Sequence, residues 1–185
     1  NGLIRAQWQP KDTQAGLDSE GRCIKEEAAK DILSRLAANP DGTIVENKKS
    51  KKKEPQRLPL SLSSLQVLAG KRYGYTPQQV LDTAQTLYER KLTTYPRSDC
   101  EYLPLNQRKD VPRILANIAA IPAGKLPKWA AGADGKIKSR AWNDSKITAH
   151  HAIIPTTVPC PFDKLTALQQ RIYYLIAQAY LAQFY

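Results

Sequence analysis

The chain has 185 residues, enough for one medium-sized domain or two small ones with a buried core. Lys and Arg number 28 against 17 Asp and Glu, which gives a formal net charge of +11. The imbalance is concentrated in residues 61–185, with 16 basic against 8 acidic side chains, whereas residues 1–60 have 12 against 9. Such an excess favours a polyanionic partner, nucleic acid first, although a basic protein without this partner has the same composition.

Cysteine usage and hydropathy exclude several classes of protein. Cys23, Cys100 and Cys160 lie far apart, without a C-x-x-C pair or a Cys/His cluster, so neither a zinc site nor a disulfide framework is indicated. No apolar run approaches the ~18 residues that span a membrane, and no signal peptide is visible. We therefore expect a cytoplasmic protein with no membrane partner. The missing initiator Met also favours a piece of a longer polypeptide.

The first third of the chain, residues 1–57, predicts two strands and one helix. Residues 4–8 alternate apolar and polar side chains, as a half-buried strand does, and residues 43–47 begin another strand. Residues 26–38 have the apolar spacing of a helix, with two glutamates at its positive end. The five lysines within residues 48–53 predict a solvated segment, with non-specific phosphate contact as the alternative.

Helical patterns dominate residues 58–185. Capping boxes mark two helix starts, one formed by Thr76 with Gln79 and the other by Thr166 with Gln169. The predicted segments are helices at 61–74, 76–90, 112–121 and from 166 to at least 185, and a loop at 122–139. The sequence as a whole therefore predicts a mainly α protein with a minor β part, in the α+β class.

The most informative segment is residues 91–104, KLTTYPRSDCEYLP, in which proline disfavours a helix. Tyr95 stands two residues before Arg97. A phenol is a poor nucleophile at neutral pH because its ordinary pKa is ~10, and a nearby guanidinium favours the phenolate and clamps a phosphate. The pair therefore predicts phosphodiester chemistry. The plain alternative is a packed strand tyrosine beside an exposed arginine.

Three blocks of this sequence together resemble type IA DNA topoisomerases, most closely the topoisomerase III branch. They are residues 91–104, LPLSLSSLQ at 58–66 and AHHAIIPT at 149–156, and their order and approximate spacing agree with the family. The resemblance is strong from residue 58 onward. It implies a winged-helix-like, mainly helical catalytic-tyrosine domain over 58–185. Residues 1–57 would be part of the β-rich arch (gate) domain and its connection.

The resemblance also implies a reaction. Tyr95 would attack single-stranded DNA, form a covalent link to the 5′ phosphate and later return the strand, which relaxes or decatenates DNA without ATP. Mg²⁺ in this family is bound by an acidic cluster on a separate metal-binding domain, whereas the acids in residues 61–185 are scattered apart from Asp99 and Glu101. We therefore expect this chain to bind single-stranded DNA, to bind no metal itself and not to cleave alone. Its partners would be the metal-binding and arch domains of the same polypeptide, in a bacterial, nucleoid-associated setting.

The resemblance assigns further site residues. Arg97 would hold the scissile phosphate, since its fork of donors matches phosphate oxygens. His150 would donate to a phosphate oxygen or lie beside the tyrosine as a positive or proton-handling group. Asp99 either orients Arg97 or caps the following turn. The other expected DNA contacts, for which capping or an exposed position is the alternative, are Ser63, Gln66, Arg72 and His151.

Other classes of protein compete with this interpretation. A tyrosine recombinase needs a His-x-x-Arg element ahead of a late tyrosine, and a relaxase needs two histidines separated by one apolar residue. The adjacent His150 and His151 follow the tyrosine and match neither pattern. The sequence is also compatible with a non-catalytic module that binds single-stranded nucleic acid, because a piece of the enzyme without metal ligands would bind DNA and not cleave it.

Overall fold

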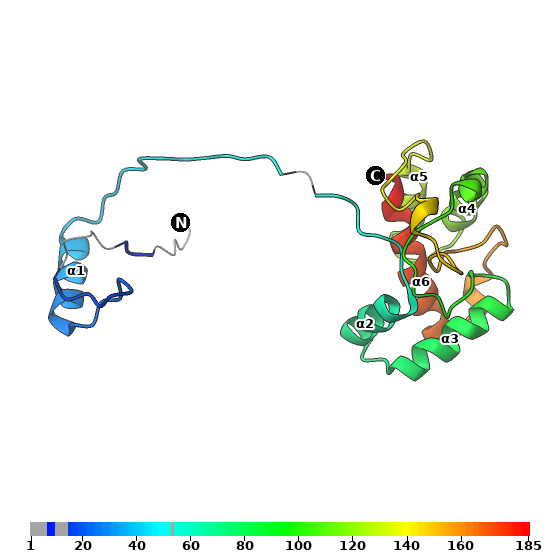
Figure 1. The fold of residues 1–185 in the computed structure, drawn as a ribbon, viewed down its shortest axis with the longest axis horizontal. Helices are drawn as coiled ribbons and strands as arrows, with labels where there is room; N and C mark the ends of the chain where they lie inside the picture. Colours follow the sequence, from blue (N-terminus) through cyan, green and yellow to red (C-terminus); the bar gives the residue numbers. More distant parts are fainter. Residues whose placement is uncertain (1–6, 10–14, 53) are drawn as a thin grey trace. The chain divides into compact units, whose positions relative to one another are not determined.

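The computed structural model describes residues 7–9, 15–52 and 54–185 (Figure 1). The chain divides into two compact units, Asn1–Lys52 and Lys53–Tyr185. The described residues are mainly helical, which confirms the mainly α part of the predicted class. β pairing within the described ranges is limited to isolated bridges.

The first unit contains helix α1, Glu26–Ala38, with the predicted bounds. Two ion pairs at helical spacing lie along it, Lys30 with Glu26 at 2.8 Å and Arg35 with Asp31 at 2.9 Å. None of its residues is buried, so its predicted apolar stripe remains open to solvent. Local pairs of this kind each contribute about 0.2–0.5 kcal/mol.

The strand predicted over residues 43–47 is wrong. These residues belong to no helix or bridge, and Ile44 and Val45 are 81% and 95% exposed. A strand must pair its backbone N–H and C=O groups with a neighbour, and the described residues offer this segment none. The strand predicted over residues 4–8 falls largely outside the described residues.

The second unit begins with two helices that the sequence predicts, α2 at Leu62–Tyr73 and α3 at Pro77–Glu89. Ser61 and Thr76 are their N-caps, and each closes a capping box three residues later. Gly74 ends α2 with φ 72°, in the left-handed region that glycine adopts without a steric cost. Local sequence therefore sets both ends of α2 and the start of α3.

The remaining segments correct two of the predictions. The helical segments are η1 at Leu105–Asp110, α4 at Val111–Ala119, α5 at Leu126–Gly132, η2 at Asp144–Lys146, η3 at Phe162–Lys164, α6 at Ala167–Leu181 and η4 at Ala182–Phe184. The loop predicted over 122–139 is wrong in its centre, where α5 forms. Leu126 and Ala130 are buried there, so packing outweighs the Gly and Pro signals. The end of the helix predicted from residue 166 to at least 185 is also wrong, because α6 ends at Leu181 and the short η4 follows it before Tyr185.

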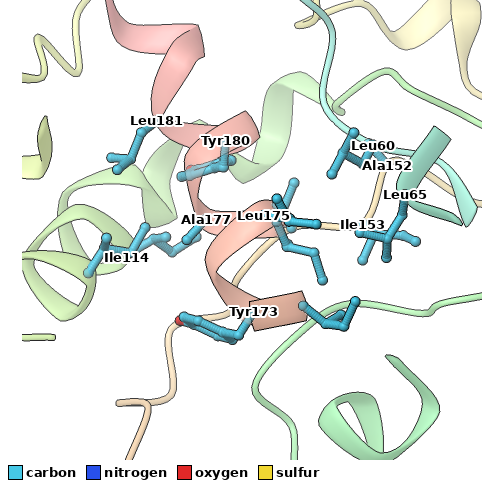
Figure 2. Packing of buried hydrophobic residues seen from close by; sticks show 14 of the residues in the cluster. Leu60, Leu65, Ile114, Ala152, Ile153, Tyr173, Leu175, Ala177, Tyr180 and Leu181 are labelled. Carbon is cyan, nitrogen blue, oxygen red and sulfur yellow. The ribbon is translucent and has the colours of Figure 1, made fainter. Parts of the chain in front are cut away.

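Helix α6 forms the centre of the core. Seven of its fifteen residues are buried, and it contacts α2, α3 and α5. Figure 2 shows Tyr173 and Leu175 of α6 in the same cluster as Leu65 of α2, Ile114 of α4 and Ile153. Among the described residues, no helix has the length and apolar character needed to cross a bilayer. The packed helices provide a rigid support for the segments between them.

Helix α3 ends in a geometry that aims the chain toward Tyr95. The N–H of Lys91 donates to the carbonyl of Tyr88 at 2.7 Å, and the N–H of Leu92 donates to that of Leu87 at 2.9 Å, which is the Schellman pattern. Lys91 has φ 58° and is the one non-glycine residue with a positive φ in the described part of the chain. A side chain in this conformation costs roughly 1–2 kcal/mol.

We predict that Lys91→Gly stabilises the chain by about 1 kcal/mol, because glycine adopts a positive φ without a steric cost. Denaturant unfolding of the 185-residue chain measures the change. Lys91→Ala is the matched control, since it removes the same charge and keeps the Cβ. An equal gain in both variants would assign the effect to charge, and no gain in Lys91→Gly would contradict the account.

Candidate active site

The three sequence blocks, which lie far apart along the chain, meet in the structure. Backbone hydrogen bonds join each block to the other two. These bonds run from Leu62 N to Ser98 O (2.8 Å), from Ile153 N to Leu60 O (2.8 Å) and from Ala152 N to Tyr102 O (2.9 Å). Because these segments include buried residues, paired backbone groups there specify the register of each block against the others.

Thr94, directly before the candidate nucleophile, makes three hydrogen bonds to the third block. Its N–H donates to the carbonyl of Ile154 at 2.9 Å. Its hydroxyl accepts from the N–H of Ile154 at 3.0 Å and donates to the carbonyl of Ala152 at 3.1 Å. One residue thus satisfies backbone groups of Ala152 and Ile154 in the third block, and it fixes the chain at Tyr95 relative to the histidine block.

The rings of Tyr95 and His150 lie against each other as a result. Their centroids are 4.4 Å apart with an interplanar angle of 35°. Tyr88, in the last turn of α3, contacts Tyr95 edge to face at 5.5 Å and 83°. Tyr95 is half-buried and His150 is exposed. Two aromatic neighbours therefore hold the phenol while it stays accessible to a substrate.

Burial alternates along the segment that follows Tyr95. The buried residues are Pro96, Ser98 and Cys100. Arg97 and Asp99 are exposed between them, so both side chains are open to solvent within four residues of Tyr95. Within residues 54–185 the structure contains no ion pair, so the Arg97 guanidinium has no carboxylate partner in that range. A free guanidinium beside a phenol is suited to binding a phosphate.

Burial separates Tyr95 from other tyrosines of the chain. Tyr173 and Tyr180 lie in the core, where burial raises the pKa of both hydroxyls well above the ordinary value. Neither can provide a phenolate to an external substrate. Tyr95 combines an accessible ring with a neighbouring guanidinium at Arg97 and an imidazole at His150.

His151 faces the protein. Its Nδ1 lies 2.8 Å from the carbonyl of Ala152, so Nδ1 donates, and its Nε2 then accepts from the side-chain amide of Gln107 at 2.8 Å. Burial lowers the pKa of His151, which keeps the ring neutral at neutral pH. Sequence reasoning missed Gln107, which belongs to none of the three blocks, and no pattern in a single sequence marks it.

Two of the expected DNA contacts lie together. Ser63 and Asp99 line a pocket of about 400 Å³, with Glu101, Lys146 and Thr148 among its other lining residues. The pocket lies where the start of α2 meets the segment after Tyr95. It offers hydroxyl, carboxylate and ammonium groups to a polar ligand.

The other two expected DNA contacts on α2, Gln66 and Arg72, form hydrogen bonds to different parts of the protein. The amide of Gln66 donates to the carbonyl of Pro77 at 3.0 Å and so ties α2 to the start of α3. Arg72 donates to the side chain of Gln178 on α6 at 3.2 Å. At 1.5 Å per residue, nine residues place Arg72 about 14 Å along α2 from Ser63. The structure therefore does not gather all four residues into one site.

The described residues form no ready-made metal site of protein ligands alone. They contain no group of three or more His, Cys, Asp or Glu side chains arranged to hold one. Mg²⁺ is usually held by one or two carboxylates together with substrate phosphates. Asp99 and Glu101 border the same pocket, but no third ligand joins them.

Comparison with known proteins identifies the family. Residues 3–185 match the family model described as DNA topoisomerase. The chain is 44% identical over 184 residues to DNA topoisomerase 3 of Vibrio cholerae and 41% identical over 186 residues to DNA topoisomerase 3 of Haemophilus influenzae. It is 40% identical over 190 residues to the same-named protein of Pasteurella multocida. Each match covers 98% of this chain.

The chain therefore belongs to the DNA topoisomerase family. Within it, the chain falls in the type IA class and its topoisomerase III branch, which confirms the resemblance seen in the three blocks. The chain spans 28% of the length of each of these three relatives.

We predict that Thr94→Val destabilises the chain by about 2 kcal/mol, because the N–H of Ile154 loses its acceptor. Valine preserves the shape of the side chain, so the loss reports the hydroxyl. Unfolding in denaturant measures it. Thr94→Ser keeps the hydroxyl and is the matched control, with a smaller loss. A Thr94→Val variant as stable as the parent chain would show that this hydrogen bond does not hold the segment.

Proposed function

We propose that this chain is the tyrosine-bearing part of a topoisomerase III that cleaves single-stranded DNA through Tyr95 and reseals it, relaxing or decatenating DNA. The observation that carries the proposal is the joining of the three blocks, which puts Tyr95 against His150 with Arg97 open beside it. Membership of the family gives this geometry its reaction class.

The proposed reaction is a transesterification. The phenolate oxygen of Tyr95 forms a bond to phosphorus, and the bond from phosphorus to the 3′ oxygen breaks. The 3′ oxygen takes up a proton, and the 5′ phosphate stays on the tyrosine. Resealing runs the same steps backward, so the phosphotyrosine conserves the bond and no ATP is needed.

Two side chains assist in this scheme. Arg97 binds the non-bridging phosphate oxygens and stabilises the charge that builds on them. His150, with its ring 4.4 Å from that of Tyr95, is placed to donate a proton or a positive hydrogen bond at the same phosphate. His151 and Gln107 are bonded inside the protein, so we assign them to holding the His150 segment and not to touching DNA.

The proposal extends to the DNA strand and to the rest of the parent protein. Ser63 and Asp99 would contact the strand at their shared pocket, with Gln66 and Arg72 further along α2. The excess of basic side chains without ion pairs in residues 54–185 supports binding of a polyanion. Mg²⁺ would be held by a metal-binding domain elsewhere in the parent, so this chain alone would bind single-stranded DNA without cleaving it.

The finer fold assignment belongs to the same proposal. Residues 58–185 would form the winged-helix-like catalytic domain, and their closely packed α2, α3 and α6 support this. Residues 1–57 would belong to the β-rich arch domain and its connection. In the cell, the parent would act at the bacterial nucleoid.

We predict that Tyr95→Phe in the intact parent abolishes cleavage of single-stranded DNA and leaves affinity unchanged, because only the attacking oxygen is lost. Cleavage with Mg²⁺ and equilibrium binding are measured on the same oligonucleotide. Tyr88→Phe is the matched control and keeps both properties. Equal loss of binding and cleavage, or cleavage that survives, would sink the assignment. A parent that binds but never cleaves would favour the non-catalytic binding module.

We predict that Arg97→Gln lowers the cleavage rate by about 10²-fold, because the transition-state charge loses a donor. The cleavage rate of Arg97→Lys should lie between those of the parent and of Arg97→Gln, since lysine restores a point charge without the planar fork of donors. Arg113→Gln is the matched control, an exposed arginine on α4 whose loss leaves the rate unchanged. A rate unaffected in Arg97→Gln would remove Arg97 from the reaction.

A further inference from the structure

Arginine and tyrosine side chains alternate on the surface where α2 turns into α3 and α6 passes behind. We name this group the arginine–tyrosine cluster, and it consists of Arg72, Tyr73, Tyr75, Arg171 and Tyr174. The two arginines are exposed and the three tyrosines are half-buried. Only Arg72 belongs to the contacts expected from the sequence.

The contacts within the cluster form a continuous series. The Arg171 guanidinium lies 6.0 Å from the Tyr75 ring centroid and 5.2 Å from that of Tyr73. The Arg72 guanidinium lies 5.5 Å from Tyr73 and 5.8 Å from Tyr174. Each guanidinium therefore contacts two rings, with both distances within the ~6 Å range of a cation–π contact.

Both guanidiniums donate hydrogen bonds to uncharged groups. Arg171 donates to the hydroxyl of Tyr75 at 2.7 Å, and Arg72 donates to the amide oxygen of Gln178 at 3.2 Å. No ion pair occurs in residues 54–185, so no carboxylate neutralises either arginine there. A guanidinium has five N–H donors, and these bonds use one donor of Arg72 and one donor of Arg171. Both arginines therefore keep positive charge and donors for an external anion.

We propose that the arginine–tyrosine cluster binds single-stranded nucleic acid. Phosphates match the free guanidinium donors, and bases stack on guanidinium planes and aromatic rings. An acidic peptide would use the charge and leave the flat surfaces without a role. A duplex keeps its base faces stacked inside, so an unpaired strand fits this cluster better.

The cluster lies apart from Tyr95. The turn at Tyr73–Tyr75 precedes α3 and Tyr95 follows it, so the two lie at opposite ends of this helix (Figure 1). Thirteen residues of helix span about 20 Å. A strand as compact as one strand of a duplex, at ~3.4 Å per nucleotide, needs about six nucleotides to reach both places, and a more extended strand needs fewer. The cluster therefore holds the DNA substrate at a distance from the cleaved bond, an inference that rests on the proposed function for the identity of that strand.

The test measures binding of the intact parent protein to a fluorescent single-stranded oligonucleotide over a range of salt concentrations. We expect Arg171→Gln to weaken binding several-fold and to reduce the slope of log K against log salt by about 0.7, the effect of one lost phosphate contact. Arg171→Lys should restore the slope and recover only part of the affinity, because an ammonium does not stack. Cleavage of the saturated complex should stay unchanged.

Arg113→Gln is the matched control, with the same change of charge at an exposed residue of α4. An equal effect of Arg171→Gln and Arg113→Gln, or a larger effect on duplex than on single strands, would overturn the inference. Arg72→Gln repeats the test on the second arginine, and an unchanged unfolding midpoint shows that each variant is folded. If no Tyr95 adduct forms in the unsubstituted parent, the proposed function fails, whereas loss of the cluster's role leaves that adduct intact.

Discussion

The hydrogen bonds of Thr94 to the backbone of Ala152 and Ile154 are the constraint on which the candidate site depends. They join two segments separated by almost sixty residues of chain, and they do so one residue before Tyr95. Local sequence alone would not bring His150 to the tyrosine, and the bonds of Thr94 act together with that from Ala152 N to Tyr102 O. The ring contact between Tyr95 and His150 is therefore a consequence of backbone pairing.

The surrounding helices make this join rigid. Helix α6, buried over much of its surface, packs against α2 and α3, and these helices flank the segments that carry the site. The capping boxes at Ser61 and Thr76 set where α2 and α3 begin. At the other end of α3, the left-handed Lys91 turns the chain into the site. Side chains held on such supports keep their geometry while one face stays open to a strand.

Sequence alone predicts the helices with strong local signals. The bounds of α1 and the N-caps of α3 and α6 follow from periodicity and capping boxes. Helix α5 was missed because its stability comes from burial of Leu126 and Ala130 and not from local signals. The strand predicted at 43–47 failed because strands need partners, which no local pattern guarantees.

The residues of the candidate site also fall into those that the sequence marks and those that only the structure reveals. The motif marks Tyr95, Arg97 and His150, and the structure brings His150 to Tyr95. The inward bonds of His151 and the part played by Gln107 depend on long-range contacts that a single sequence does not reveal. The arginine–tyrosine cluster joins side chains from α6 to those of the α2–α3 turn, about a hundred residues apart, and only the folded chain shows it.

The most direct test of the central claim uses the intact parent protein, Mg²⁺ and a single-stranded oligonucleotide labelled at its 3′ end. After denaturation, label bound covalently to protein is traced to one residue by peptide mass. The account predicts label on Tyr95, which establishes the nucleophile and the 5′-phosphate link together. Label on another residue, or none under conditions where the protein binds DNA, would contradict it.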